Sequence, residues 1–150
     1  MAQFQLAQLN VARMIAPLDA PLMAGFVARL EEINQLADAA PGFIWRLQTE
    51  EGDATALRPF DADLLVNLTV WADLESLAKF VYRTAHSEVM RQRRSWFSQE
   101  PEATMVLWWI PSGDLPTVDQ AAERLALLRR HGPTARAFTF RQPYAQDGSA

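Results

Sequence analysis

His86 is the residue in this sequence whose type and spacing point most directly to chemistry. It is one of two histidines in the chain, and a run at helical spacing follows it: Val89, Met90, Arg93 and Phe97. Residues at these intervals share one face of a helix, so we expect His86 to face a sheet or the gap beside it. Two roles stay open there: a buried histidine that fixes a bend in the helix, or a polar group of a ligand pocket.

A second set of candidates lies on the predicted strands. Asn10, Arg46 and Asn67 are polar residues within largely apolar segments, and a few polar groups that converge on an apolar cavity are typical of a small-molecule site. The five tryptophans of the chain either pack in a core or a dimer interface, or they line a pocket for a flat apolar ligand. On the pocket hypothesis the catalytic candidates are His86 and Asn67, and the ligand-binding candidates are Asn10, Trp45, Arg46, Arg93, Phe97 and Trp109.

Several common catalytic signatures are absent from the sequence. It has no cysteine, which excludes disulfides, thiolate zinc sites, iron–sulfur clusters and cysteine nucleophiles. It also has no Gly-rich phosphate loop, no HExxH motif and no G-x-S-x-G elbow. His131 precedes Gly-Pro, a pattern that ends helices, so we predict no metal site and no role for His131 in catalysis.

Composition narrows the class of protein. The chain has 150 residues and a formal net charge of −4; this favours a single domain and argues against a nucleic-acid binder, because phosphate recognition needs a basic face. No segment approaches the roughly 20 apolar residues of a membrane span. The start of the sequence lacks the pattern of a signal peptide, so we expect a cytoplasmic protein.

Hydrophobic periodicity predicts the secondary structure. Alternation predicts strands at 4–13, 42–50, 63–71 and 103–111 and a last short strand at 135–142. Apolar residues at three-to-four spacing predict helices at 22–37, 74–83 and 118–130, with a bend near Thr84 and a further helical segment to Phe97. Asp73 and Thr117 are the expected N-caps, and residues from about 144 form an expected flexible tail.

The predicted order is β-α-β-β-α-β followed by an extra helix and strand. This is the ferredoxin-like α+β plan, an antiparallel sheet with its helices on one face. The segment 63–71 is substantially apolar on both faces, as expected when both are covered by protein. Because the helices of this plan cover one face, we predict a homodimer whose second copy covers the other and closes a barrel. Alternation in segment 42–50 places Phe43, Trp45 and Leu47 on one face.

Several blocks of the sequence resemble a known family. In order and spacing, PGFIWRLQ, RPF, VNLTVWADLESLAKFVYRTAHSEVMRQRRSWF, LWWIP and RRHGPTARAFTFRQP are similar to the domain-of-unknown-function family 3291, which is placed among the dimeric α/β-barrel proteins. The resemblance runs from about Leu6 to Pro143. The wider superfamily includes antibiotic-biosynthesis monooxygenases and haem-degrading oxygenases, and the match to it is weaker.

This resemblance implies a pocket between the sheet and the helices that holds a polycyclic substrate or a haem. In cofactor-free monooxygenases of this fold a phenolic substrate reacts with oxygen as its anion. The resemblance then implies that His86 is the base or an orienting hydrogen-bond donor, and that Asn67 or Trp45 stabilises the anion. In haem-binding relatives a histidine on the corresponding helix ligates the iron, and His86 looks similar to that axial ligand. Arg93 or Arg46 would then contact the haem propionates. A non-catalytic homodimer, with His86 as a core histidine, is the alternative from another class.

Overall fold

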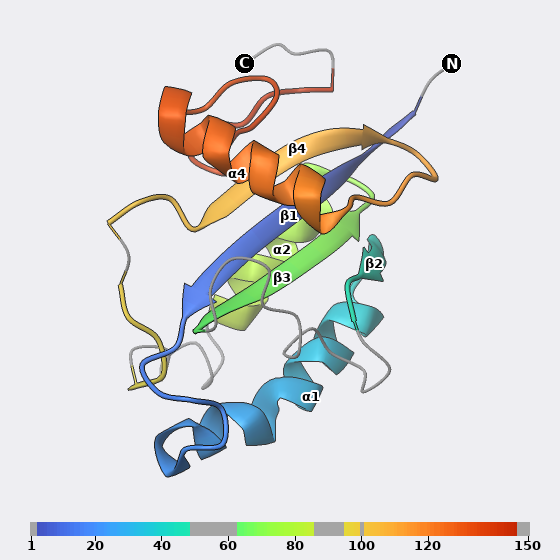
Figure 1. Cartoon of the computed structure of the whole chain (residues 1–150). Helices are drawn as coiled ribbons and strands as arrows, with labels where there is room; N and C mark the ends of the chain where they lie inside the picture. Colours follow the sequence, from blue (N-terminus) through green and yellow to red (C-terminus); the bar gives the residue numbers. More distant parts are fainter. Residues whose placement is uncertain (1–2, 49–62, 86–94, 100, 147–150) are drawn as a thin grey trace.

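The computed structural model describes residues 3–48, 63–85, 95–99 and 101–146, and these form an α+β fold (Figure 1). The strands are β1 (Phe4–Arg13), β2 (Phe43–Arg46), β3 (Leu64–Trp71) and β4 (Met105–Pro111). The helices are α1 (Ala24–Ala39), α2 (Leu74–Ala85) and α4 (Val118–His131), and a short 3-10 helix, η1 (Pro21–Met23), precedes α1. Among the described residues no helix is long and apolar enough to cross a membrane.

The strands form one antiparallel sheet in the order β2-β3-β1-β4. The two central strands, β1 and β3, pair over eight residues, with Leu6 opposite Trp71 and Arg13 opposite Leu64. This strand order and the observed element order, β-α-β-β-α-β with α4 added, are those of the ferredoxin-like plan. The predicted element order and the extra helix are therefore confirmed.

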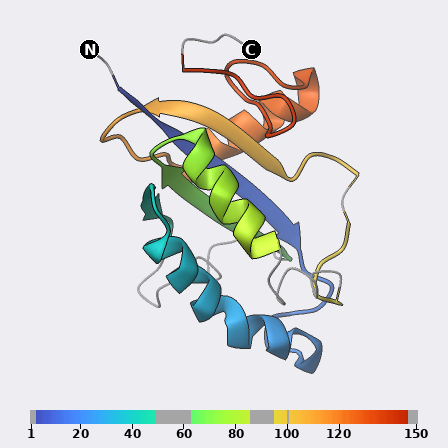
Figure 2. The ribbon, with the colours of Figure 1, turned by 180° about the vertical axis from the view of Figure 1, so that it is seen from behind.

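Helices cover both faces of the sheet, which the sequence analysis did not predict. Figure 1 shows α4 in front of the sheet, and Figure 2, from behind, shows α1 and α2 on the opposite side. We call these the α4 face and the α1/α2 face. On the α4 face, side chains of α4 pack against strand residues that are at most 8% exposed within one chain; they are Ala121, Leu125 and Leu128 against Ala7, Leu9, Val66, Leu68, Val70, Val106, Trp108 and Ile110.

This arrangement removes the argument from which the homodimer was predicted. That argument required a sheet face left uncovered by the chain's own helices, and α4 supplies the missing cover. The sequence of an amphipathic helix shows that one side of it is buried, but it does not show which face of the sheet the helix covers. The homodimer and the dimeric barrel remain predictions, and an uncovered sheet face no longer supports them.

The predicted last strand, 135–142, is wrong. In this segment only Phe138 pairs with the sheet, through Leu107 N to Phe138 O (2.8 Å) and Phe138 N to Leu107 O (2.9 Å). Ala137 packs on the α4 face and Phe138 on the α1/α2 face, so the chain wraps the outer edge of β4. Covering an edge in this way protects its unpaired backbone groups. Tyr144, where the tail was expected to begin, donates from its hydroxyl to the carbonyl oxygen of Pro133 (3.4 Å).

A β-bulge in β2 changes the facing of its residues. The pairing of β2 with β3 shifts register between Phe43 and Trp45, and a bulge places two residues opposite one. As a result Phe43 packs against Trp71 on the α1/α2 face, while Trp45 packs on the α4 face. The prediction that Phe43 and Trp45 share a face is wrong.

The predicted helix caps are confirmed. Thr117 forms a capping box with Gln120: the Thr117 hydroxyl accepts from Gln120 N (3.1 Å) and the Gln120 side chain accepts from Thr117 N (3.0 Å). Asp73 Oδ1 accepts from Ser76 N (2.7 Å), and this bond lowers the pKa of Asp73. Helix α2 runs through Thr84 to Ala85, and most of the segment predicted to follow it lies outside the described residues.

Gly42 joins α1 to β2 at a point where no side chain fits. Its φ is +83°, and a Cβ added there would overlap the Ser76 side chain at the start of α2. We predict that Gly42→Ala lowers the free energy of unfolding by ~3 kcal/mol, because it adds an overlap to the strain of a left-handed residue. Urea denaturation measures the loss.

Gly113 provides the matched control for this prediction. Its φ is +92°, but an added Cβ would meet nothing within 4 Å. Gly113→Ala therefore bears the backbone strain alone, about 1 kcal/mol. Equal losses for the two variants would show that the contact between Gly42 and Ser76 does not constrain the fold.

Candidate functional site

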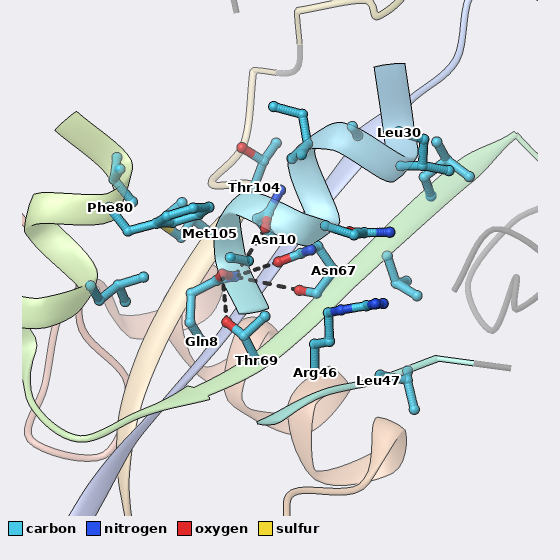
Figure 3. A pocket seen from close by; sticks show the side chains of 18 of the residues that line it. Gln8, Asn10, Leu30, Arg46, Leu47, Asn67, Thr69, Phe80, Thr104 and Met105 are labelled. Atoms are coloured by element: carbon cyan, nitrogen blue, oxygen red, sulfur yellow. Dashed lines mark hydrogen bonds between the residues drawn. The ribbon is translucent and has the colours of Figure 1, made fainter. Parts of the chain in front are cut away.

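A cavity of about 320 Å³ lies between the α1/α2 face of the sheet and the two helices (Figure 3). This volume is at the lower end of the range of small-molecule sites. Its apolar lining includes five aromatic side chains: Phe26, Trp71, Phe80, Trp96 and Phe97. Four of the side chains that line it from the sheet are polar, and we call these four, Gln8, Asn10, Asn67 and Thr69, the polar floor.

The polar floor is placed by the pairing of the two central strands. Alternate residues of a strand share a face, so Gln8 and Asn10 point to the same side of β1. The register sets Gln8 opposite Thr69 and Asn10 opposite Asn67. Four polar side chains are thus brought together at the centre of a face that is apolar at both ends.

Hydrogen bonds join the four residues to one another and to Trp71. Gln8 Nε2 donates to Asn10 Oδ1 (2.9 Å), and the same nitrogen lies 3.4 Å from the backbone oxygen of Asn67 and 3.5 Å from its Oδ1. Thr69 Oγ1 donates to Gln8 Oε1 (3.4 Å) and accepts from Trp71 Nε1 (2.9 Å). Gln8 is 3% exposed and Thr69 4%. These buried polar groups therefore depend on one another rather than on solvent.

Helix α1 spans the cavity and is held mainly at its ends. Near its start Phe26 packs against Trp96, with ring centroids 5.7 Å apart, and against Phe97 in an edge-to-face contact at 5.0 Å. A Cβ on Gly25 would lie 3.2 Å from the Trp96 ring, so the helix backbone is close to the indole. Aromatic contacts of this geometry stabilise by about 1 kcal/mol beyond their buried area.

The other end of α1 is fixed by an ion pair to β2. Arg46 Nε lies 2.8 Å from Asp38 Oδ1, and Arg46 Nη2 lies 3.3 Å from Asp38 Oδ2. This two-point geometry is the more specific form of an arginine–carboxylate pair. Ala37 is the one fully buried residue of α1. Between the two ends, Leu30, Ile33 and Asn34 line the cavity.

The charged groups of the lining are cationic. Arg29 and Arg46 line the cavity, and its described lining residues include no aspartate, glutamate, histidine, lysine or tyrosine. A guanidinium group carries positive charge and only donates hydrogen bonds, so this lining favours a neutral or anionic ligand over a cation. The part of the chain that the structure describes contains no cluster of three or more residues able to hold a metal ion.

Four of the residues predicted from the sequence line the cavity: Asn10, Arg46, Asn67 and Phe97. They reach it from β1, β2, β3 and the segment after α2, so the structure brings together residues distant in sequence. Their roles in binding or catalysis stay predictions. His86 and Arg93 lie outside the described residues, so the roles proposed for them, including haem ligation, are not addressed by the structure.

Two predicted residues do not line this cavity. Trp45 packs on the α4 face because of the bulge in β2. Trp109 packs beside Phe138, with ring centroids 6.4 Å apart, and its Nε1 donates to the backbone oxygen of Tyr144 (2.9 Å). Its indole N–H is satisfied within the fold, so the structure shows Trp109 as part of the core beside the C-terminal segment.

Several lining residues were not predicted from the sequence, among them Gln8, Arg29, Thr69 and Trp71. A signal for two of them was present. Gln8 and Thr69 share strand faces with Asn10 and Asn67 by alternation, and a glutamine or threonine at such a position is as informative as an asparagine. Helical spacing sets Arg29 apart from the apolar stripe of its helix, so periodicity did not point to it as a lining residue.

Comparisons with known proteins identify the family. The model of the domain of unknown function DUF3291 matches residues 5–150. No curated protein matches the chain. The fold is similar to that of SnoaB, a cofactor-independent oxygenase from Streptomyces nogalater, with a TM-score of 0.49 and 13% identity over 76% of this chain and 96% of that chain. A protein of unknown function from Nitrosomonas europaea is similar with a TM-score of 0.42 and 15% identity over 77% of this chain and 97% of that chain.

Proposed function

The chain belongs to the DUF3291 family, and we propose that this member is a small-molecule enzyme or binder whose cavity takes a flat, largely apolar ligand with an oxygen atom that accepts hydrogen bonds. The walls suit the flat apolar part, because aromatic side chains surround it. The polar floor suits the oxygen. The observation that carries the proposal is the polar floor at the base of an apolar cavity.

An unfilled volume also argues against the alternative of a purely structural protein. If the aromatic side chains served only to pack the core, they would be expected to fill the space between α1 and the sheet. Instead about 320 Å³ remains between them. Polar residues at that place would weaken a core, whereas a few polar groups in an apolar recess are typical of a site that orients a ligand.

The reaction that this site would support best passes through a ligand oxyanion. Amide N–H groups and nearby arginines stabilise negative charge that develops on an oxygen, and they do so most strongly where water is excluded. A cofactor-free oxygenation is one such reaction: O2 is the oxidant, a ring CH2 becomes C=O, and the second oxygen atom leaves as water. In this proposal Asn10 and Asn67 hold the oxyanion and Arg46 supplies positive charge.

The proton acceptor for such a reaction is not among the described lining residues. None of them is a carboxylate, histidine or tyrosine. Either the ligand enters as an anion, or a base from outside the described residues takes its proton, and His86 is the candidate from the sequence. The described residues therefore supply binding and charge stabilisation.

Asn67 tests the binding proposal, because its side chain is exposed within the cavity and belongs to the polar floor. We predict that Asn67→Leu weakens the binding of 2-naphthoate about tenfold, since the ligand carboxylate loses a hydrogen-bond donor. Isothermal titration calorimetry measures the affinity. The melting temperature is expected to change little.

Gln35→Leu is the control, because it also removes an exposed carboxamide but from a residue that does not line the cavity. Its affinity for 2-naphthoate is expected to match that of the wild type. The proposal fails if 2-naphthoate does not bind the wild-type protein, or if Asn67→Leu binds it as tightly as Gln35→Leu does.

The charge of the site leads to a second prediction. A bound phenol experiences burial, which disfavours its anion, and donors with nearby arginines, which favour it. We predict that the hydrogen-bond donors and Arg46 outweigh the effect of burial, so that the pKa of 2-naphthol is lower when it is bound than when it is free. Absorbance titration of the naphtholate band, with and without excess protein, measures the difference.

A raised pKa for bound 2-naphthol would mean that burial dominates. The site would then be a poor place for oxyanion chemistry, and the oxygenase proposal would fall while ligand binding stood. Arg46→Met is expected to reduce the downward shift, because it retains much of the length of the side chain and removes its charge.

A further inference from the structure

The hydrogen bonds of the polar floor have a direction, and Trp71 sets it at one end. An indole N–H donates and cannot accept, so Trp71 Nε1, 2.9 Å from Thr69 Oγ1, makes the threonine oxygen an acceptor. The Thr69 hydroxyl proton is then available for Gln8 Oε1, 3.4 Å away. Thr69 Oγ1 has a second lone pair and could accept another hydrogen bond, but its proton needs an acceptor, and among the described residues that acceptor is Gln8 Oε1. This end of the network therefore favours the orientation in which Gln8 presents its oxygen to Thr69.

The backbone of β3 sets the same direction at the other end. Gln8 Nε2 lies 3.4 Å from the backbone oxygen of Asn67, and a carbonyl oxygen only accepts. The group of Gln8 that faces Asn67 must therefore be its NH2. The carbonyl oxygen of Asn67, which cannot donate, and the Thr69 hydroxyl proton, which needs an acceptor, therefore favour the same orientation of the Gln8 carboxamide.

The reverse orientation would leave buried groups unpaired. With its amide turned over, Gln8 would set its oxygen against the carbonyl oxygen of Asn67, and the Thr69 hydroxyl proton would lose Gln8 Oε1 as its acceptor. Gln8 and Thr69 are 3% and 4% exposed, so water cannot compensate. An unsatisfied buried polar group is destabilising by roughly 1–3 kcal/mol.

The orientation of Gln8 fixes that of the two asparagines. Gln8 Nε2 donates to Asn10 Oδ1 at 2.9 Å and lies 3.5 Å from Asn67 Oδ1, so both asparagine oxygens face Gln8. Figure 3 shows the amide nitrogens of Asn10 and Asn67 on the side away from it. Within the described part of the chain neither nitrogen donates to a protein atom, and both residues line the cavity.

We propose that Trp71, Thr69 and Gln8 are positioning residues that make the polar floor a donor-only surface, so that the cavity selects ligands whose polar atom accepts hydrogen bonds. Carbonyl, carboxylate and phenolate oxygens fit this surface, and amine or pyrrole N–H groups do not. The inference rests on the proposed function, because it names the class of ligand that the same site takes. A site that holds one hydrogen-bonding pattern rejects the opposite pattern strongly, since mismatched groups stay unpaired.

Two flat neutral probes of similar size test this selection. 1-Indanone only accepts hydrogen bonds through its carbonyl, whereas indole donates through its N–H. We expect the wild-type protein to bind 1-indanone about tenfold more tightly than indole in isothermal titration calorimetry. Neutral probes keep the arginine charges out of the comparison.

Thr69→Val tests the positioning role, because valine keeps the shape of threonine and removes the hydroxyl that joins Trp71 to Gln8. Without that link one of the two constraints on the Gln8 carboxamide is lost, so the reverse orientation, in which the asparagine amides are also reversed, becomes populated. The preference for 1-indanone is expected to fall to about twofold or less. Thr139→Val, which removes a hydroxyl from a residue outside the cavity lining, is expected to retain the full preference.

The orientation itself is measurable in the wild-type protein without any variant. In an ¹⁵N-edited NOE spectrum, the Gln8 side-chain NH2 protons are expected to show contacts to the β-protons of Asn10 and Asn67. Contacts to the Thr69 methyl group instead would place the amide the other way round and overturn the proposal. This measurement decides the question even if Thr69→Val does not fold.

The binding outcomes separate this inference from the proposed function. Equal affinities for the two probes overturn the donor-only floor while a ligand-binding cavity stands. An unchanged preference in folded Thr69→Val overturns the positioning role. If neither probe binds the wild-type protein and 2-naphthoate also fails to bind, the proposed function falls and this inference falls with it.

Discussion

The structure depends on a row of polar side chains at the centre of an otherwise apolar sheet face. Gln8, Asn10, Asn67 and Thr69 meet across β1 and β3 because of the strand register, and they satisfy one another through hydrogen bonds. An apolar helix laid directly on them would bury the amide groups that still need partners, at a cost of roughly 1–3 kcal/mol for each one left unsatisfied. Helix α1 instead crosses above the row, and Ala37 is its one fully buried residue. The cavity is the space that this separation leaves.

The two faces of the sheet have different roles: the α4 face carries the larger packed core, and the α1/α2 face carries the cavity. On the α4 face, branched and aromatic side chains of all four strands pack with α4 into the larger buried cluster. Burial of apolar area on this scale is the main source of stability in a domain of this size. The α1/α2 face then does not need to be close-packed at its centre. Helix α1 is anchored by aromatic contacts around Phe26 at one end and by the pair of Asp38 and Arg46 at the other, and the middle is available for a ligand.

The fold was largely predictable from the sequence, and each element that was predicted wrongly has a specific physical cause. Alternation located β1 to the residue, and side-chain chemistry located the caps of α2 and α4, because both signals are local. The bulge after Phe43 was not predictable, since it arises from pairing with β3. The side of the sheet on which α4 lies depends on a chain crossing that amphipathicity does not encode. For the site, polar residues on strands identified Asn10 and Asn67. Alternation also places Gln8 on the strand face of Asn10, but its hydrogen bond to Thr69 depends on the register of β1 and β3, which the sequence does not show.

A crystal structure with 6-bromo-2-naphthoate would test the central claim most directly, because the bromine atom marks the ligand by its anomalous signal. The account predicts the naphthyl ring between Phe26, Phe80 and Trp96, with a carboxylate oxygen within hydrogen-bond distance of the amide nitrogens of Asn10 and Asn67. A space between α1 and the sheet filled by protein side chains would contradict it. So would a ligand found in that space with its carboxylate turned away from the polar floor.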